Sequence, residues 1–407
     1  MRKIQNTRKW NNIAKHFSAK GFDGEALVSK LKQLNSFVNA NTIKWLGGLF
    51  DPNIGGFYYS NSAKENDEYL PDIESTSQAL NILHCAGVFD SYDWIPPKMR
   101  KSIGCFITSC ADQNGFFYNP QWSKEKANSL HARRGRDLTS AISLVSKLSI
   151  ASPYPTALDN LNDRATSEFE YSTLKTKESF EEYLRSLYLI ENDHLAIHTL
   201  CSQRQQIKAA GFADATVDYL SEMLSNGRIE KISDTQERLS AYSACVTLCN
   251  DLEHRFDFYA TASELALSEL LKADKKLLPY CEHPWGFFKK LFVNLSSYGS
   301  DEDKKVADEL KTKICAVALD ALDALCRNIS VFSKSDGSMS YTTSGSSEYS
   351  QGMKVAEGGA YEGDVNATLI FLCTIDAVWA VLGIKEQQIH PLSNDDLDDF
   401  IKYALEQ

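Results

Sequence analysis

The sequence predicts an all-α fold, an (α/α)6 toroid of about six helical hairpins with inner and outer rings of helices, in a single domain over residues 1–407. Two observations carry this prediction. Helical stretches headed by Asp recur along the chain, and no stretch alternates apolar and polar residues for long enough to build a sheet. An open superhelix should show capping repeats and a tighter period, so we expect a closed ring.

Three segments of the chain share one layout. Each has a glycine turn, a polar loop of variable length and then a helix headed by Asp, as in GGFYYSNSAKENDEYLPDIESTSQAL; the segments begin at Gly55, Asn114 and Asp336. Asp72, Asp137 and Asp364 occupy the same place in their repeats. An Asp there can accept hydrogen bonds from free backbone N–H groups, so each is predicted to cap an inner helix.

Further helix starts are predicted near Asp193, Asp234 and Pro284, which brings the number of hairpins to about six. The helices after the three repeated aspartates are less polar, as expected for an inner ring. Intervening stretches such as KKVADELKTKICAVALDALDAL are amphipathic, as expected for outer helices with one face in solvent.

Composition excludes several classes of protein. A net charge of -11 argues against binding to nucleic acid, because a phosphate backbone repels an acidic surface. No apolar run is long enough for a transmembrane helix, and the N-terminus lacks the pattern of a secretory signal, so a cytoplasmic location is expected. The ten cysteines form no CxxC pair and lie mostly in apolar helical stretches, which predicts buried free thiols.

The glycine-aromatic turns followed by PDIEST resemble the repeats of the α/α toroid in terpenoid cyclases and protein prenyltransferases. Class II terpene cyclases carry Asp-x-Asp-Asp-Thr at such a helix head, and the middle Asp protonates the substrate. The stretch here keeps Asp72 and Thr76, places Glu74 at the position of the proton donor and has Ser75 in place of the last Asp. The resemblance implies Glu74 as general acid beside Asp72. Alternatively, Asp72 only caps the helix and Glu74 complements its dipole.

The metal chemistry of that superfamily is not matched. The zinc site of the prenyltransferases needs an Asp-x-Cys that is absent here, and their β subunit needs a helical partner chain. His194 and His198 share one helix face but have no evident third ligand, so no metal site is predicted. The cofactor stays unknown, with Mg²⁺ expected only if the substrate is a diphosphate.

Candidate substrate-binding residues fall in two other stretches. Arg133, Arg134 and Arg136 directly precede Asp137, where three guanidinium groups at a helix start could bind a diphosphate or a carboxylate. The alternative is a set of solvated loop arginines paired with local acids. Trp122 belongs to a group of aromatic residues in the turns, which could stabilise a carbocation, stack on a sugar or wedge the hairpins together.

The second stretch, GGAYEGDVNAT, supplies Tyr361, Glu362 and Asp364 at the head of the last inner helix. The glycine-rich loop from Gly345 to Gly363 is long for a structural connection, which favours a lid or a binding loop. Asp364 is equally explained as a helix cap.

Three functions are compatible with these residues. The first is cyclisation of an isoprenoid, in which Glu74 acts as acid and the arginines hold a diphosphate. The second is a carbohydrate-active (α/α)6 enzyme, such as a glycosidase, an unsaturated-uronyl hydrolase or a sugar epimerase, that uses paired carboxylates at its mouth. The third is a non-enzymatic toroid that binds a peptide or protein. The sequence motif of the repeats favours the first function. The expected partner is a small-molecule substrate, either an isoprenoid diphosphate or a glycan.

Overall fold

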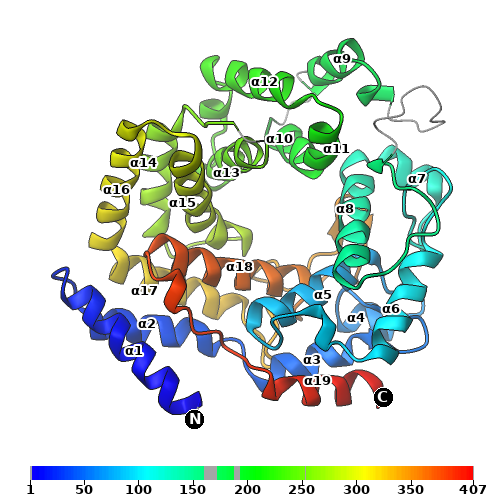
Figure 1. Ribbon diagram of the computed structural model, residues 1–407, viewed down its shortest axis with the longest axis horizontal. Helices are drawn as coiled ribbons and strands as arrows, with labels where there is room; N and C mark the ends of the chain where they lie inside the picture. The colour runs from blue at the N-terminus through cyan, green and yellow to red at the C-terminus, as the bar shows by residue number, and fades with distance from the viewer. Residues whose placement is uncertain (1, 160–171, 188–192, 253, 407) are drawn as a thin grey trace.

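The computed structural model describes residues 2–159, 172–187, 193–252 and 254–406 (Figure 1). The chain is mostly helical, which confirms the predicted all-α class. Strands in the described residues are limited to two short antiparallel pairs. None of the described helices is long and apolar enough to span a membrane.

Six helices contact one another in a closed order, from α5 to α8, α10, α13, α15 and α18 and back to α5. We term them the central helices; their bounds are α5 Ile73–Ala86, α8 His131–Lys147, α10 Asp193–Ser202, α13 Thr235–Asp251, α15 Pro279–Tyr298 and α18 Val365–Val381. Because each packs between two neighbours, most residues of α5, α13, α15 and α18 are buried.

The other helices surround the central helices (Figure 1). They are α1 Arg2–Ser18, α2 Gly24–Ser36, α3 Ala40–Gly48, α4 Asn61–Glu65, α6 Pro97–Ser109, α7 Lys124–Ser129, α9 Lys177–Leu187, α11 Arg204–Ala209, α12 Ala213–Ser225, α14 Tyr259–Leu270, α16 Asp301–Ala316, α17 Ala318–Phe332 and α19 Asp395–Leu405. α6 packs on α8, α12 on α13 and α14 on α15, while α17 contacts α2, α14 and α15. The C-terminal α19 returns to pack along α3.

The strands form two hairpins. β1 (Phe50–Asp51) pairs with β2 (Gly56–Phe57) around the first glycine turn, and β3 (Tyr349–Ser350) pairs with β4 (Met353–Lys354). Gln351 and Gly352 connect β3 to β4, and both have positive φ, as a two-residue hairpin turn requires. The second hairpin therefore orders part of the long glycine-rich loop.

Most predicted helix starts are confirmed. Asp72, Asp234 and Asp364 are the N-caps of α5, α13 and α18, and each side chain accepts a backbone N–H of the first turn. α10 starts at Asp193. The amphipathic stretch before the third repeat forms two helices, α16 and α17.

Two predicted starts are wrong. Asp137 does not open a helix, because α8 already begins at His131 and contains the whole arginine run as well as Asp137. α15 begins at Pro279, so Pro284 lies inside the helix. Pro279 occupies the first helical position, where a missing N–H costs nothing, and it supplies the start signal that was assigned to Pro284.

A threonine joins the first glycine turn to its helix. The turn is closed by Gly55, whose φ of 90° is accessible to Gly at little cost. Two residues later, the backbone N–H of Phe57 donates to Oγ1 of Thr76 at 3.0 Å, and that hydroxyl donates to the carbonyl of Asp72 at 2.8 Å. We call this arrangement the threonine clamp. It explains physically why Asp and Thr are four residues apart.

The third repeat contains the same clamp. Thr368 Oγ1 accepts from the backbone N–H of Met339 at 3.0 Å and donates to the carbonyl of Asp364 at 2.8 Å. The second repeat has the glycine turn, with Gly115 at a φ of 80°, but Ala141 follows Asp137 by four residues and has no hydroxyl. In two of the three repeats, the shared sequence pattern is therefore explained by the packing of the glycine turn against the start of the helix.

All ten cysteines are free. Five are buried, as predicted, but Cys105 and Cys373 are exposed. Aromatic residues of the turns, including Phe57, Phe116 and Phe117, are buried in the core. These rings wedge the hairpins together.

Candidate functional site

Arg133 is the centre of a buried cluster of charged residues that joins α5 to α8. Its guanidinium group, which is 0% exposed, lies 3.2 Å from Asp72 Oδ1 (Nη2) and 3.1 Å from Glu74 Oε2 (Nη1). It also donates to both carboxylate oxygens of Asp137, at 3.0 Å through Nε and 2.7 Å through Nη2. We call Arg133, Asp72, Glu74 and Asp137 the Arg133 cluster.

Local structure places these four groups together. Arg133 and Asp137 are four residues apart on α8 and share one face, while Asp72 and Glu74 belong to the first turn of α5, which packs on α8. Asn119, in the loop before α7, completes the arrangement. Its Nδ2 donates to Asp137 at 2.9 Å, and its Oδ1 accepts from the backbone N–H of Ile73 at 2.8 Å.

The cluster holds three carboxylates against one guanidinium group. Burial raises the pKa of Asp137 to about 7, although Arg133 acts in the opposite direction. Burial alone would lower the pKa of Arg133, but the charges of Asp137, Glu74 and Asp72 outweigh it and raise that pKa above its ordinary value. Burial and the neighbouring carboxylates therefore favour the neutral form of Asp137, while the guanidinium group of Arg133 favours its charged form.

Glu74 has further contacts outside the cluster. Its Oε1 lies 3.5 Å from Nη1 of Arg136 and 3.4 Å from Nε2 of Gln78. Its Oε2 also accepts from Oγ of Ser350, in the hairpin of the glycine-rich loop, at 3.2 Å. Gln78 Nε2 donates in turn to Asn366 Oδ1 of α18 at 3.0 Å. All of these groups around Glu74 are hydrogen-bond donors, and such surroundings suit a carboxylate that accepts hydrogen bonds.

The three predicted arginines differ in their surroundings. Arg133 is saturated by carboxylates and carries the ring of Trp122 at 4.4 Å from its Cζ, so Trp122 contacts the cluster from one side. Arg134 is buried, donates to Asn128 and stacks on Phe116. Arg136 has a side chain that is 44% exposed, so it is the arginine of this run most accessible to a ligand.

Both predicted acidic residues of the last loop accept hydrogen bonds from backbone N–H groups. Glu362 accepts from the backbone N–H of Ser62 at 2.9 Å and from its hydroxyl at 2.5 Å, which fixes the start of α4. Asp364 is fully buried and accepts from the backbone N–H groups of Ala367 and Tyr341. Burial raises the pKa of Asp364 to about 7, against the hydrogen bond from Ala367.

Tyr361 lies apart from the Arg133 cluster and is 73% exposed. Nζ of Lys334, a buried residue in the turn after α17, lies 3.6 Å from the centroid of its ring. The site predicted from sequence is therefore divided. The structure gathers Asp72, Glu74, Arg133 and Arg136 in one place, while Glu362, Asp364 and Tyr361 have partners of their own.

Polar contacts between neighbouring central helices are a feature that sequence analysis missed. Besides Arg136 with Glu74 and Gln78 with Asn366, further pairs in the described residues link adjacent helices: Lys147 Nζ with Asn81 Oδ1 at 2.8 Å, His198 Nε2 with Ser240 Oγ at 3.0 Å, Lys290 Nζ with Thr247 Oγ1 at 2.8 Å and Lys289 Nζ with Asp376 Oδ2 at 2.6 Å. The side chain of His194, the other predicted histidine, lies outside the described residues. Polar residues spaced four and three apart, such as Glu74, Gln78 and Asn81, were the available sequence signal.

Comparison with known proteins gives no relative: the chain matches no protein-family model and no curated protein, and no solved structure matches it. In the described part of the chain, no group of three or more His, Cys, Asp or Glu side chains could hold a metal ion.

Proposed function

We propose that the chain is an (α/α)6 toroid and that its central opening is the functional site. The closed order of contacts among the six central helices supports this architecture. So does the order along the chain, because α3, α6, α12, α14 and α17 each precede a central helix and lie outside the closed series. One domain over residues 1–407 follows from this arrangement.

Accessible residues on α18 support an opening at the centre. They include Asn366, Cys373 and Asp376, which are spaced seven and three residues apart and so share one face. Cys373 is exposed although α18 packs between two neighbouring helices. An accessible face on such a helix is what an opening among the central helices would produce.

A carbohydrate is the substrate class that fits this opening best. The observation that carries the proposal is the set of polar contacts between neighbouring central helices, which involve carboxylate, amide, hydroxyl, imidazole and ammonium groups. Sugar hydroxyls both donate and accept, so they can replace such contacts one for one. An isoprenoid needs an apolar cavity instead.

Cyclisation of an isoprenoid is less well supported. A general acid that protonates an alkene has to stay neutral, in apolar surroundings or beside a like charge. Glu74 instead contacts the guanidinium groups of Arg133 and Arg136. Phe57, Phe116 and Phe117 of the turns are buried in the core, which favours a packing role over the lining of a cavity for a carbocation.

Arg136 specifies the kind of sugar. Its exposed guanidinium group has donors beyond the contact with Glu74 at 3.5 Å and suits a carboxylate of a uronic acid. Beside it, Glu74 is the predicted acid that can exchange a proton with the substrate, because Asp72, Glu362 and Asp364 hold backbone groups. We infer an enzyme acting on an acidic glycan, with Glu74 as general base and Arg136 as the substrate-binding residue.

Binding assays with the full chain test this proposal. Uronate oligosaccharides, their neutral counterparts and polyprenyl diphosphates are titrated against the protein and against Arg136→Gln. A charge-assisted hydrogen bond contributes on the order of 1.5 to 3 kcal/mol, so Arg136→Gln should weaken uronate binding about 10- to 150-fold. Arg327→Gln is the matched control, because Arg327 is exposed and pairs with Asp323 on the same helix.

The outcomes separate the three functions. Turnover of a uronate oligosaccharide supports the proposal, and turnover of a polyprenyl diphosphate replaces it with the cyclase. Binding of a peptide or protein without turnover of either small molecule supports the non-enzymatic toroid.

A further inference from the structure

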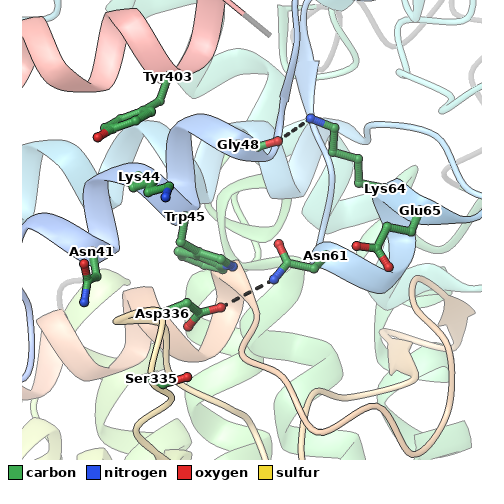
Figure 2. A pocket seen from close by; sticks show the side chains of 10 residues that line it. All are labelled: Asn41, Lys44, Trp45, Gly48, Asn61, Lys64, Glu65, Ser335, Asp336 and Tyr403. Carbon is green, nitrogen blue, oxygen red and sulfur yellow. Dashed lines mark hydrogen bonds between the residues drawn. The ribbon is translucent and has the colours of Figure 1, made fainter.

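A pocket of about 800 Å³ lies away from the central helices (Figure 2). Its lining comes from α3, α4, α19 and the turn after α17, with Trp45, Asn61, Tyr403 and Asp336 as the main side chains. Asn61 Nδ2 donates to Asp336 Oδ2 at 3.4 Å across it, and Lys64 Nζ donates to the carbonyl of Gly48. The volume is in the range of small-molecule sites.

Trp45 supplies an unused donor. The residue is 5% exposed and its indole N–H has no hydrogen-bond partner. Figure 2 shows the nitrogen directed toward Asn61, on the lining of the pocket. A buried N–H without a partner costs free energy, so the site is poised for an acceptor that enters from the pocket.

The rest of the lining balances this donor. Asp336 and Glu65 bring carboxylates and Lys44 and Lys64 bring ammonium groups, so the charges cancel. Tyr403 adds an aromatic ring on the side of α19, opposite Asp336 (Figure 2). Donors, acceptors and a ring with no net charge are what a neutral saccharide requires, because its hydroxyls pair with both kinds of group and its C–H face packs on an aromatic.

We propose that this pocket binds a neutral oligosaccharide of two or more units through the N–H of Trp45 and the carboxylate of Asp336. The site is separate from the central opening and does not depend on the function proposed for it. Gly48 lines the pocket, and a Cβ added there would meet no atom within 4 Å. A larger side chain at this position is therefore expected to occupy part of the pocket.

Saturation-transfer NMR with the full chain tests the proposal, using cellobiose, maltotriose and chitobiose as probes and a dipeptide as the zwitterionic alternative. One of the saccharides should bind, Gly48→Phe should weaken its binding at least tenfold and Trp45→Phe about three- to tenfold. Trp94→Phe, which changes an exposed indole, and Arg136→Gln at the central opening should leave its binding unchanged. Thermal unfolding of each variant shows whether it is folded.

The proposal would be overturned by the absence of binding by all three saccharides, by saccharide binding that survives in a folded Gly48→Phe variant, or by binding of the dipeptide in their place. If Gly48→Phe is unfolded, Trp45→Phe decides: unchanged affinity then excludes the pocket. Loss of saccharide binding in Arg136→Gln would place the ligand in the central opening instead.

Discussion

Nη1 of Arg133 lies 3.1 Å from Oε2 of Glu74, and neither side chain has more than 6% of its surface exposed. The two residues are 59 positions apart, so this contact fixes the first turn of α5 against α8. Asp72 and Asp137 share the same guanidinium group. Three buried carboxylates therefore share the charge of Arg133, and Arg136 contacts only Glu74 among them.

Replacing Arg133 by Met should destabilise the protein strongly. Removal of one partner of a buried ion pair costs about 3 to 5 kcal/mol, because the remaining charge is left without compensation. Urea unfolding at pH 7 measures the loss. Arg327→Met, in an exposed pair, should cost at most about 1 kcal/mol. Equal losses in the two variants would contradict the central role of Arg133.

The pH dependence of stability should report on Asp364. Its pKa is about 7 when folded against 3.8 as the ordinary value, because it is buried. The folded state thus holds a proton that the unfolded state releases, and the contribution of Asp364 to stability falls as pH rises from about 4 to 7. Above pH 7 it is constant.

Asp364→Asn removes this titration and keeps an oxygen for the cap. The stability of the variant relative to the parent should rise between pH 5 and pH 7, by up to about 1.4 kcal/mol per pH unit. Chemical unfolding at pH 5, 6, 7 and 8 measures the difference. Asp23→Asn, at the exposed N-cap of α2, is the control. A difference that does not change with pH would show that Asp364 is charged throughout.

The threonine clamp predicts unequal effects of one substitution on a single helix. Thr368→Val leaves the buried backbone N–H of Met339 without an acceptor, at a cost of about 1 to 3 kcal/mol. Thr374→Val on the same helix removes only a hydroxyl that donates to Ile370 and should cost less than 1 kcal/mol. Urea unfolding compares the two. Equal costs would mean that the clamp does not hold the turn.

The sequence predicts those features that depend on near neighbours. Asp72 and Asp364 are found as caps because each stands next to the N–H groups it accepts, and the glycine turns are found because Gly55 and Gly337 need positive φ. The start of α8 was missed for the opposite reason. Its first turn has no capping side chain.

The candidate site depends on distant contacts. The arginine run, with Gly135 inside it, has the composition of a loop, but Arg133 is held in a helix by carboxylates from α5. Gly135 also brings α8 close to α10, since a Cβ there would lie 2.8 Å from the carbonyl oxygen of Ser202. Neither contact can be recognised from the residues that neighbour it in the sequence. The pairing of the residues, and the different exposure of Arg134 and Arg136, follow only from the packing of helices.

The last prediction concerns Glu74. If Glu74 exchanges a proton with an acidic glycan, Glu74→Gln should lower kcat by about 10² to 10⁴, because general acid–base catalysis contributes a factor of that size. Glutamine keeps the shape and can still accept from Arg133, so the variant should remain folded. Glu362→Gln is the matched control, since Glu362 holds the start of α4 through Ser62. Steady-state kinetics on a uronate oligosaccharide, with thermal unfolding in parallel, compares the variants. Full activity in a folded Glu74→Gln would leave Glu74 as a structural member of the Arg133 cluster.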